Sequence, residues 1–497
     1  MIELKNVCFS YSGRDGGGLN HINLKVQDGE CILLCGPSGC GKTTISRLIN
    51  GLIPRYFTGE LTGNVLLNGR EVSDMAMFEL SECVGSVFQN PRTQFFNTDT
   101  DSEIAFGLEN KGKPPTELRR RVETVTGDMG LEDVRGHSLH ALSGGEKQKI
   151  AFASVYAMDQ DVYLLDEPSS NLDMDAIQEL KEHLELIKKQ GKTIVIAEHR
   201  LYYLMELADR VIYLESGRIV REYTPKQFMA LPDSEREQMG LRAADLSRVH
   251  PAVPQYGPVP AALELRDVGL YYNKVPIVEN INIKAGASEI IGVLGHNGAG
   301  KTTFSRALCG LHRQTSGEFI WKGRVKPRKE RLRQSYMVMQ DVNFQLFADS
   351  VESECSFGIQ DPDLNLAAST LDKLGLTPYR TCHPNTLSGG QKQRLAVAVS
   401  MICGKEILVF DEPTSGLDFD SMVQVADLVK KLAAMGKVIF IVTHDYEFIC
   451  RTCSRVLYID KGEGCFDLSV SAESEGLLQA LLGMKNQAFN KKGVKII

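Results

Sequence analysis

Two glycine-rich segments carry the residues best suited to hold phosphate groups. GPSGCGKT (Gly36–Thr43) and GHNGAGKT (Gly295–Thr302) both fit the spacing G-x-x-x-x-G-K-[ST], and each follows a short apolar run. Glycines let successive backbone N–H groups turn toward phosphate oxygens, and a helix that begins at the lysine adds the positive end of its dipole. Two such matches predict two nucleoside triphosphate sites.

Each loop supplies a set of candidate nucleotide ligands. The lysine is expected to reach the β- and γ-phosphates, and the following threonine hydroxyl to hold Mg²⁺. The predicted ligands are Gly36, Ser38, Gly39, Gly41, Lys42, Thr43 and Thr44 in the first segment, and Gly295, Asn297, Gly298, Gly300, Lys301, Thr302 and Thr303 in the second.

A pair of carboxylates ends one apolar run in each half of the chain. Asp166-Glu167 follows VYLL and Asp411-Glu412 follows ILVF. Each aspartate is placed to bind Mg²⁺, directly or through its water, and each glutamate to orient or deprotonate an attacking water. A turn cap is the structural alternative.

These motifs belong to a long internal repeat. The opening MIELKNVCFSY, the phosphate loop, LSGG, the carboxylate pair and a final IAEH or IVTH run recur in the same order. Short apolar runs such as CILLC, VYLLD and TIVIA predict buried parallel strands, and Thr43–Asn50 and Met174–Gln190 predict helices between them. The pattern predicts two homologous α/β domains, with phosphate chemistry at the carboxyl ends of the strands.

Composition limits the classes of function. The chain has 497 residues, a net charge of −7 and a pI near 5.9, which weighs against nucleic-acid binding. The 12 cysteines include several in apolar runs, as expected of reduced core thiols in a cytosolic protein. The sequence has neither a run of about 20 apolar residues nor a secretory signal, so we expect a soluble chain whose membrane role needs a partner.

The repeat also sets the predicted domain boundaries. They are a first domain at 1–223, a linker at 224–262 that is proline-bearing in its second part, a second domain at 263–468, and a C-terminal helix and basic tail at 469–497. The helix is expected over Gly476–Leu482. The tail reads as a solvated end, with a weak contact to an anionic membrane surface as the alternative.

LSGGE (Leu142–Glu146) and LSGGQ (Leu387–Gln391) precede the two carboxylate pairs at equal distance. With this element each half resembles the ATP-binding cassette of ABC proteins. The resemblance implies an α/β fold of two tandem P-loop ATPase domains, each with a RecA-like core, a β-subdomain and a small helical subdomain. It also implies contact of the ATP γ-phosphate with Ser143, Gly144, Gly145, Ser388, Gly389 and Gly390. A helix cap by each serine is compatible with that contact.

The remaining roles follow from the same resemblance. Tyr11 and Tyr272 match the aromatic residue that stacks on adenine, and Tyr271 competes with Tyr272. The implied catalytic residues are Glu167, Glu412, His199, His444, Gln89 and Gln340. The implied Mg²⁺ ligands, some through water, are Thr43, Gln89, Asp166, Thr302, Gln340 and Asp411. Asp173 and Asp418 match the loop that contacts the opposite cassette.

In the family, two cassettes face each other head to tail, and each ATP lies between one P-loop and the opposite LSGG. The pairing could form within this chain or between two chains. Both sites keep the full catalytic set, with mild departures: Glu146 replaces the commoner Gln, and Ser170-Asn171 replaces Ser-Gly. A carboxylate near ATP is unfavourable unless paired, so the Lys301 site is expected to turn over differently.

The segments after the first P-loop narrow the resemblance. Gly51–Gly63, the run QNPRTQFF after Val87-Phe88, and Ser102–Asn110 closely resemble the ATPases of energy-coupling factor importers. Those take up vitamins or metal ions through a transmembrane scaffold subunit and a membrane substrate-binding subunit. The resemblance places the chain peripherally at the cytoplasmic face of the cell membrane. Four phenylalanines read either as core or as a groove for a partner helix: Phe95, Phe96, Phe344 and Phe347.

Three other machines stay open at this point. Sugar-import ATPases also fuse two cassettes, although their second P-loop is usually altered and Gly295–Thr302 is intact. Soluble two-cassette factors that act on ribosomes carry a long charged linker, whereas this linker is short and not basic. Drug or lipid exporters normally fuse membrane helices.

Overall fold

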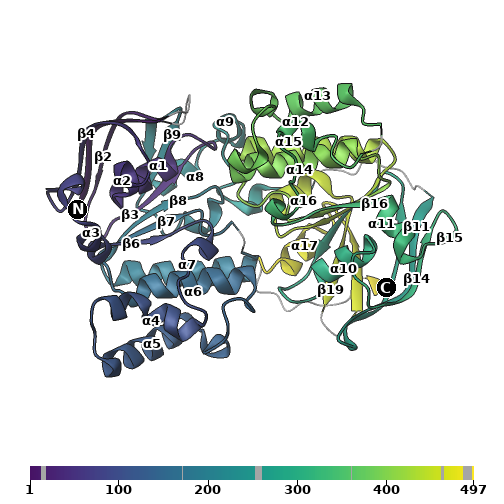
Figure 1. Ribbon diagram of the computed structural model, residues 1–497, viewed down its shortest axis with the longest axis horizontal. Helices are drawn as coiled ribbons and strands as arrows, with labels where there is room; N and C mark the ends of the chain where they lie inside the picture. The colour runs from purple at the N-terminus through teal and green to yellow at the C-terminus, as the bar shows by residue number, and fades with distance from the viewer. Residues whose placement is uncertain are drawn as a thin grey trace. The chain divides into compact units, whose positions relative to one another are not determined.

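The computed structural model describes residues 1–12, 18–170, 172–251, 260–359, 361–460, 464–484 and 495–496. These residues form two compact units, Met1–Asp245 and Leu246–Ile497 (Figure 1). Most of the predicted basic tail, and Asn171, lie outside the described residues. Across the described ranges, every helix is too short or too polar to span a membrane.

A largely parallel sheet forms the centre of the first unit, in the order β10-β9-β3-β8-β7-β6. Strands β3 and β8 are buried along their whole length, which explains why their sequences are continuously apolar. Only β10 runs antiparallel to its neighbour. The strands are β3 (Cys31–Cys35), β6 (Val84–Val87), β7 (Val162–Asp166), β8 (Thr193–Ala197), β9 (Arg210–Glu215) and β10 (Arg218–Tyr223).

A second, antiparallel sheet covers α1 and the central sheet on one side. Its order is β2-β1-β4-β5, and its inward residues share one apolar core with α1 and alternate residues of β3, β7 and β8. The strands are β1 (Ile2–Tyr11), β2 (Leu19–Val26), β4 (Gly59–Leu67) and β5 (Arg70–Glu71). This sheet is the β-subdomain that the resemblance implies.

Helices on the other face of the central sheet share a separate core, and α4, α5 and α6 pack together within it (Figure 1). The helices of this unit are α1 (Lys42–Ile49), α2 (Leu52–Arg55), α3 (Met77–Cys83), α4 (Thr100–Asn110), α5 (Pro115–Met129), α6 (Gly144–Ala157), α7 (Met174–Lys189), α8 (Pro225–Met229) and α9 (Asp233–Gln238). Short 3-10 turns are η1 (Val72–Asp74), η2 (Pro91–Thr93), η3 (Glu132–Val134) and η4 (Tyr202–Leu204).

The second unit repeats both sheets, in the orders β12-β11-β14-β15 and β16-β17-β18-β13-β19-β20-β21. Its strands are β11 (Ala261–Tyr272), β12 (Val275–Gly286), β13 (Ile290–Leu294), β14 (Thr315–Trp321), β15 (Arg324–Val325), β16 (Ser335–Val338), β17 (Ile407–Asp411), β18 (Val438–Val442), β19 (Arg455–Asp460), β20 (Gly464–Ser469) and β21 (Lys495–Ile496). Its helices are α10 (Lys301–Leu308), α11 (Arg328–Gln334), α12 (Val351–Glu354), α13 (Leu364–Lys373), α14 (Gly389–Ile402), α15 (Phe419–Ala434), α16 (Tyr446–Thr452) and α17 (Glu475–Leu481). Its 3-10 turns are η5 (Leu246–Arg248), η6 (Val342–Phe344), η7 (Thr377–Tyr379) and η8 (Pro384–Thr386).

The α/β class, the doubled architecture and the buried parallel strands predicted from sequence are confirmed. The first predicted helix begins one residue earlier, at Lys42. The segment between the two predicted domains contains α8, α9 and η5, and residues 252–259 lie outside the described part of the chain.

Candidate nucleotide and magnesium sites

Both phosphate loops lie between the end of a buried strand and the start of a helix. The residue before each helix is a glycine with a left-handed backbone, Gly41 at φ 109° and Gly300 at φ 102°. An added Cβ at Gly36 would lie 2.1 Å from the Leu214 carbonyl oxygen, so the loop can form only with glycine there. At Gly39 the same Cβ would meet nothing within 4 Å. The loop is therefore packed at its base and open where phosphate oxygens would approach.

The two loop lysines are buried and turned back over their own loops. The Lys42 ammonium donates to the Gly36 and Pro37 carbonyl oxygens at 2.8 and 3.2 Å, and its side chain is 5% exposed. The Lys301 ammonium donates to the Gly295 carbonyl at 2.6 Å. A buried cation held by neutral carbonyls has much to gain from an anion, so both loops fit the phosphates of a nucleotide.

Each predicted Mg²⁺ threonine reaches its predicted aspartate. The Thr43 hydroxyl donates to Asp166 at 3.1 Å, and the Thr302 hydroxyl donates to Asp411 at 3.3 Å. Burial, and next the neighbouring Glu167 charge, raise the pKa of Asp166 to about 6. Burial also raises the pKa of Asp411. A divalent cation would relieve this cost, and the hydroxyl–carboxylate pairs are hard oxygen donors that suit Mg²⁺.

Protein groups alone do not complete a metal site at these positions. Among the described residues there is no cluster of three or more His, Cys, Asp or Glu side chains able to hold a metal. The threonine and aspartate of each pair would therefore hold Mg²⁺ together with phosphate oxygens and water, which keeps fewer protein ligands than a closed structural metal site.

The first unit brings three predicted catalytic side chains together. The Gln89 amide donates to Glu167 Oε2 at 2.6 Å, and His199 Nε2 lies 3.4 Å from Glu167 Oε1. The Glu167 side chain is 13% exposed and that of His199 is 6% exposed. Glu167 directly follows β7 and has a left-handed backbone, with φ 48°.

The second unit holds the same groups more loosely. His444 Nε2 lies 3.8 Å from Glu412 Oε1, and Glu412 repeats the left-handed backbone at φ 49°. Gln340 follows β16 as Gln89 follows β6, and its side chain is exposed. The two candidate catalytic sites therefore contain the same residue types, but the histidine and the glutamate lie farther apart in the second unit.

Both LSGG elements begin a helix with a reciprocal cap. Ser143 Oγ accepts from the Glu146 N–H, and the Glu146 carboxylate accepts from the Ser143 N–H at 2.7 Å. Ser388 and Gln391 repeat the arrangement, with 2.8 Å for the second bond. The cap and the phosphate roles are compatible, because each serine O–H can still donate. The partner that the sequence left open for Glu146 is thus its own helix N-terminus.

Space next to these helices is open where a phosphate would approach. A Cβ added at Gly144 or at Gly389 would meet nothing within 4 Å, and at Gly390 it would meet only a Leu417 methyl group at 3.2 Å. Helix-start N–H groups that have no partner within the helix can bind an anion.

The two candidate adenine-stacking tyrosines differ in how far neighbouring side chains hold them in place. The Tyr11 hydroxyl lies 3.0 Å from the Thr44 hydroxyl and accepts from Arg47 at 3.1 Å, and its ring packs edge-on against Phe9 and Phe57. The hydroxyl of Thr44, a predicted nucleotide ligand, therefore forms a hydrogen bond with Tyr11 in this structure. The Tyr272 ring is 65% exposed.

The competing Tyr271 has other partners. Its hydroxyl donates to Glu279 at 3.0 Å. The free aromatic face in the second unit is therefore that of Tyr272.

A buried carboxylate beside each histidine was not singled out from the sequence. Glu198 is 2% exposed and accepts from the His199 N–H at 2.7 Å and from the Tyr203 hydroxyl at 3.1 Å. In the second unit Asp445, on the other side of His444, accepts from the Thr414 hydroxyl at 2.8 Å. The signal was present: a carboxylate adjoins the repeated histidine in both IAEH and IVTHD.

Comparison with known proteins decides the family. The family model described as ABC transporter matches residues 19–170 and 278–415, together more than half of the chain. The chain belongs to the ABC transporter family. It is an ABC ATPase with two tandem cassettes, as the LSGG resemblance predicted, and membership implies ATP hydrolysis.

Relatives match this chain over most of its length. A Treponema denticola protein named as an ABC transporter ATP-binding protein is 49% identical over 93% of this chain and 96% of its own length. A Methanosarcina acetivorans protein of the same name is 31% identical over 93% and 85%. Ribosome-bound archaeal ABCE1, solved with Pelota, is 21% identical over 95% of this chain and 80% of its own, with a TM-score of 0.70, a likeness of fold alone.

Proposed function

We propose that this ABC ATPase energises an importer of the energy-coupling factor type, for uptake of a vitamin or a metal ion. Its partners would be a transmembrane scaffold subunit and a membrane substrate-binding subunit, and it would act at the cytoplasmic face of the membrane. The relatives named as transporter ATP-binding proteins support a transport role. The observation that carries the proposal is an apolar groove in the first cassette.

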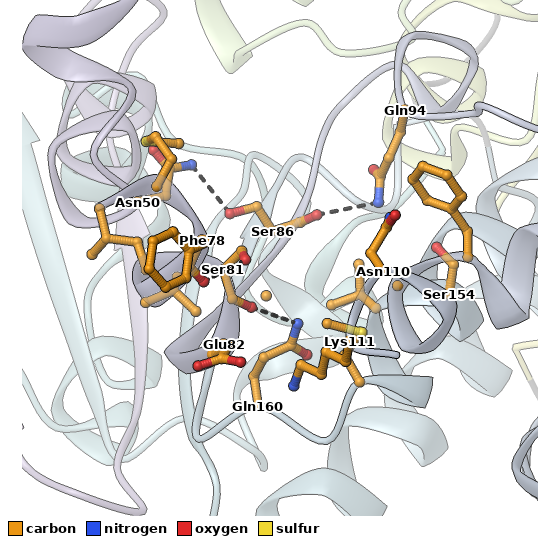
Figure 2. A pocket seen from close by; sticks show the side chains of 18 of the residues that line it. Asn50, Phe78, Ser81, Glu82, Ser86, Gln94, Asn110, Lys111, Ser154 and Gln160 are labelled. Atoms are coloured by element: carbon orange, nitrogen blue, oxygen red, sulfur yellow. Dashed lines mark hydrogen bonds between the residues drawn. The ribbon is translucent and has the colours of Figure 1, made fainter. Parts of the chain in front are cut away.

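This groove has a volume of about 590 Å³ and lies between the α3–β6 side and the α4–α6 side of the cassette (Figure 2). Phe78 and Phe96, which are 70% and 74% exposed, line it. Phe96 stacks on Phe106 with ring centroids 4.8 Å apart. Polar side chains also line it, among them the charged Glu82 and Lys111. A groove that combines exposed aromatic rings with polar and charged side chains suits an amphipathic partner helix.

The second cassette presents aromatic side chains after the same glutamine. Phe344, Phe347 and Phe357 are 64%, 66% and 57% exposed. The ring centroids of Phe347 and Phe357 are 6.3 Å apart. Phe95 differs from the other three candidates, because it is partly buried and packs against the core. Exposed phenylalanines at matching positions of both cassettes support docking of membrane subunits by both.

Within this proposal, each ATP lies between the P-loop of one cassette and the LSGG of another. Lys42 neutralises phosphate charge, Ser388 and the following N–H groups bind the γ-phosphate, and Glu167 accepts the proton of the attacking water. The other site pairs Lys301 and Glu412 with Ser143. Mg²⁺ held by the threonine–aspartate pairs would supply further charge neutralisation.

The proposal is tested by capture of the full chain from detergent-solubilised membranes of its own organism. Small hydrophobic scaffold and binding subunits are expected in the wild-type eluate and are expected to be lost with Phe96→Asp plus Phe347→Asp. Both rings are exposed, so the variant should keep its melting temperature. Ribosomal subunits in place of membrane proteins would overturn the importer assignment.

A further inference from the structure

We propose that Gln94 and Gln345 are positioning residues, which hold the catalytic Gln89 and Gln340 in register with the groove that receives the partner. The proposal rests on the proposed function, because it assigns the connection between docking and hydrolysis to particular side chains. It is carried by hydrogen bonds that these glutamines and a buried glutamate accept from backbone N–H groups, and these bonds recur in both cassettes.

Gln94 holds the N-terminal end of the segment from Gln89 to Phe96 by hydrogen bonds. Its side-chain oxygen accepts from the Phe88 N–H, the residue before Gln89, at 3.4 Å. Its amide donates to the Ser86 carbonyl in β6 at 3.3 Å, the contact drawn in Figure 2, and to the Ala151 carbonyl in α6 at 3.4 Å. Because α6 is the helix that begins with LSGG, Gln94 joins the strand, the glutamine loop and the signature helix.

Glu103 holds the C-terminal end of the same segment by hydrogen bonds. Its carboxylate is 2% exposed and accepts from the Phe96 and Asn97 N–H groups at 3.0 and 2.8 Å. A buried carboxylate that accepts several N–H groups is a strong local constraint. The residues from Gln89 to Phe96 are therefore held at both ends, one at the catalytic glutamate and the other at the groove.

The second cassette repeats the bonds that the glutamine and the glutamate accept from backbone N–H groups. The Gln345 amide differs from that of Gln94, because it donates to the Tyr336 hydroxyl in β16 at 3.3 Å. Gln345 accepts from the Met339 N–H, the residue before Gln340, at 2.6 Å. Glu354 is 3% exposed and accepts from the Phe347 and Ala348 N–H groups at 2.8 and 2.7 Å. Helix α12 has 4 residues where α4 has 11, so the bonds recur despite a large change in their surroundings.

The consequence is a mechanical link between two sites. When a docked helix displaces Phe96, the displacement reaches Gln89, because hydrogen bonds hold the segment from Gln89 to Phe96 at both ends. The Gln89 amide, which donates to Glu167 at 2.6 Å, then shifts relative to the base and the attacking water. A misplacement of about 1 Å can change a rate by up to about 100-fold.

The test is a double-mutant cycle on steady-state ATPase activity of the full chain. Gln94→Met plus Gln345→Met keeps side-chain volume and removes the polar bonds at both sites. Gln89→Ala plus Gln340→Ala removes the groups they position. We expect each pair to lower kcat about tenfold, with KM within twofold, and all four substitutions together to lower kcat no further than the Gln89–Gln340 pair alone.

Other outcomes separate the possibilities. An effect of the four substitutions equal to the product of the two pairs, or an unchanged kcat in the methionine pair, overturns the positioning role. Should the methionine pair fail to fold, Gln94→Met alone is compared with Gln89→Ala alone by the same criterion. Gln178→Ala, an exposed glutamine on α7, is the matched control and should leave kcat unchanged. Failure of the importer proposal would instead show in the membrane capture, with this cycle unaffected.

Discussion

At the scale of single residues, the two candidate bases combine backbone strain with close polar contacts. Glu167 and Glu412 have φ near 48° and 49°, a region that costs a residue with a Cβ roughly 1–2 kcal/mol. Their N–H groups donate to Ala197 and Val442 at 2.8 Å, which holds the strained turn on the neighbouring strand. The same strain at the same point of both repeats indicates a functional requirement on where the carboxylate points.

We expect Glu167→Gln plus Glu412→Gln to lower ATPase activity at least about 100-fold, because an amide cannot accept the proton of the attacking water. Nucleotide binding should persist, since the P-loops are unchanged. Phosphate release assays and nucleotide-binding titrations on the same preparation give both readouts. If either single substitution leaves steady-state turnover intact, two equivalent coupled sites are excluded.

Asp166 makes a pH-dependent contribution. Its folded-state pKa is raised to about 6, above the ordinary value of 3.8, mainly by burial. Between about pH 4 and 6 the folded chain holds a proton that the unfolded chain has lost, so this group's contribution to stability falls as pH rises. Mg²⁺ requires the ionised carboxylate, so Mg²⁺–ATP should raise the melting temperature more at pH 7.5 than at pH 5.5.

Asp166→Asn separates this effect from protonation of ATP itself. The variant should lose most of the pH-dependent part of the Mg²⁺–ATP shift in melting temperature, and it should be less sensitive to pH without ligand. An unchanged pH dependence in the variant would show that another group carries it.

At the scale of elements, glycines of the P-loop and of the signature helix have different roles: one is needed for folding and the other for binding. Gly144 lies in the first turn of α6, and an added Cβ there meets nothing within 4 Å. The same addition at Gly36 lies 2.1 Å from a carbonyl oxygen, at φ 148°. An added methyl group should therefore affect binding at Gly144 and folding at Gly36.

We expect Gly144→Ala to keep the melting temperature within a few degrees and to lower ATPase activity at least about tenfold, because the methyl group occupies the approach to the helix N–H groups. Gly36→Ala should lower the melting temperature strongly or prevent folding. Thermal melts and ATPase assays on both variants test the pair. Full activity in folded Gly144→Ala would remove the signature helix from the phosphate site.

Sequence reasoning recovered the elements that positional repetition marks. A helix follows each glycine-rich loop, and the aspartates of the carboxylate pairs end β7 and β17, as the repeated motifs predicted, although the first helix begins at Lys42 and not at Thr43. It could not foresee the roles of Gln94 and Glu103, because most of their partners are backbone N–H and carbonyl groups, which leave no residue pattern. Nor could it rank Phe95 against Phe96, since only packing of the loop decides which ring is buried.

At the scale of the whole molecule, the proposed function makes a prediction about which P-loop shares an ATP with which LSGG. The head-to-tail scheme assigns Lys42 and Ser388 to one site, and Lys301 and Ser143 to the other. Each serine caps its own helix start, so replacing it by arginine should block phosphate approach and cost about 1 kcal/mol of stability through the lost cap.

Paired substitutions in the full chain distinguish the schemes by counting occupied sites. Lys42→Ala plus Ser388→Arg would damage one site twice and leave the other able to trap Mg²⁺–ATP in a Glu167→Gln, Glu412→Gln background. Lys42→Ala plus Ser143→Arg would damage both sites and trap none. Radiolabelled ATP retained per chain after gel filtration measures this, with one nucleotide expected for the first variant and none for the second. The reverse pattern would mean that each P-loop shares its ATP with the LSGG of its own cassette.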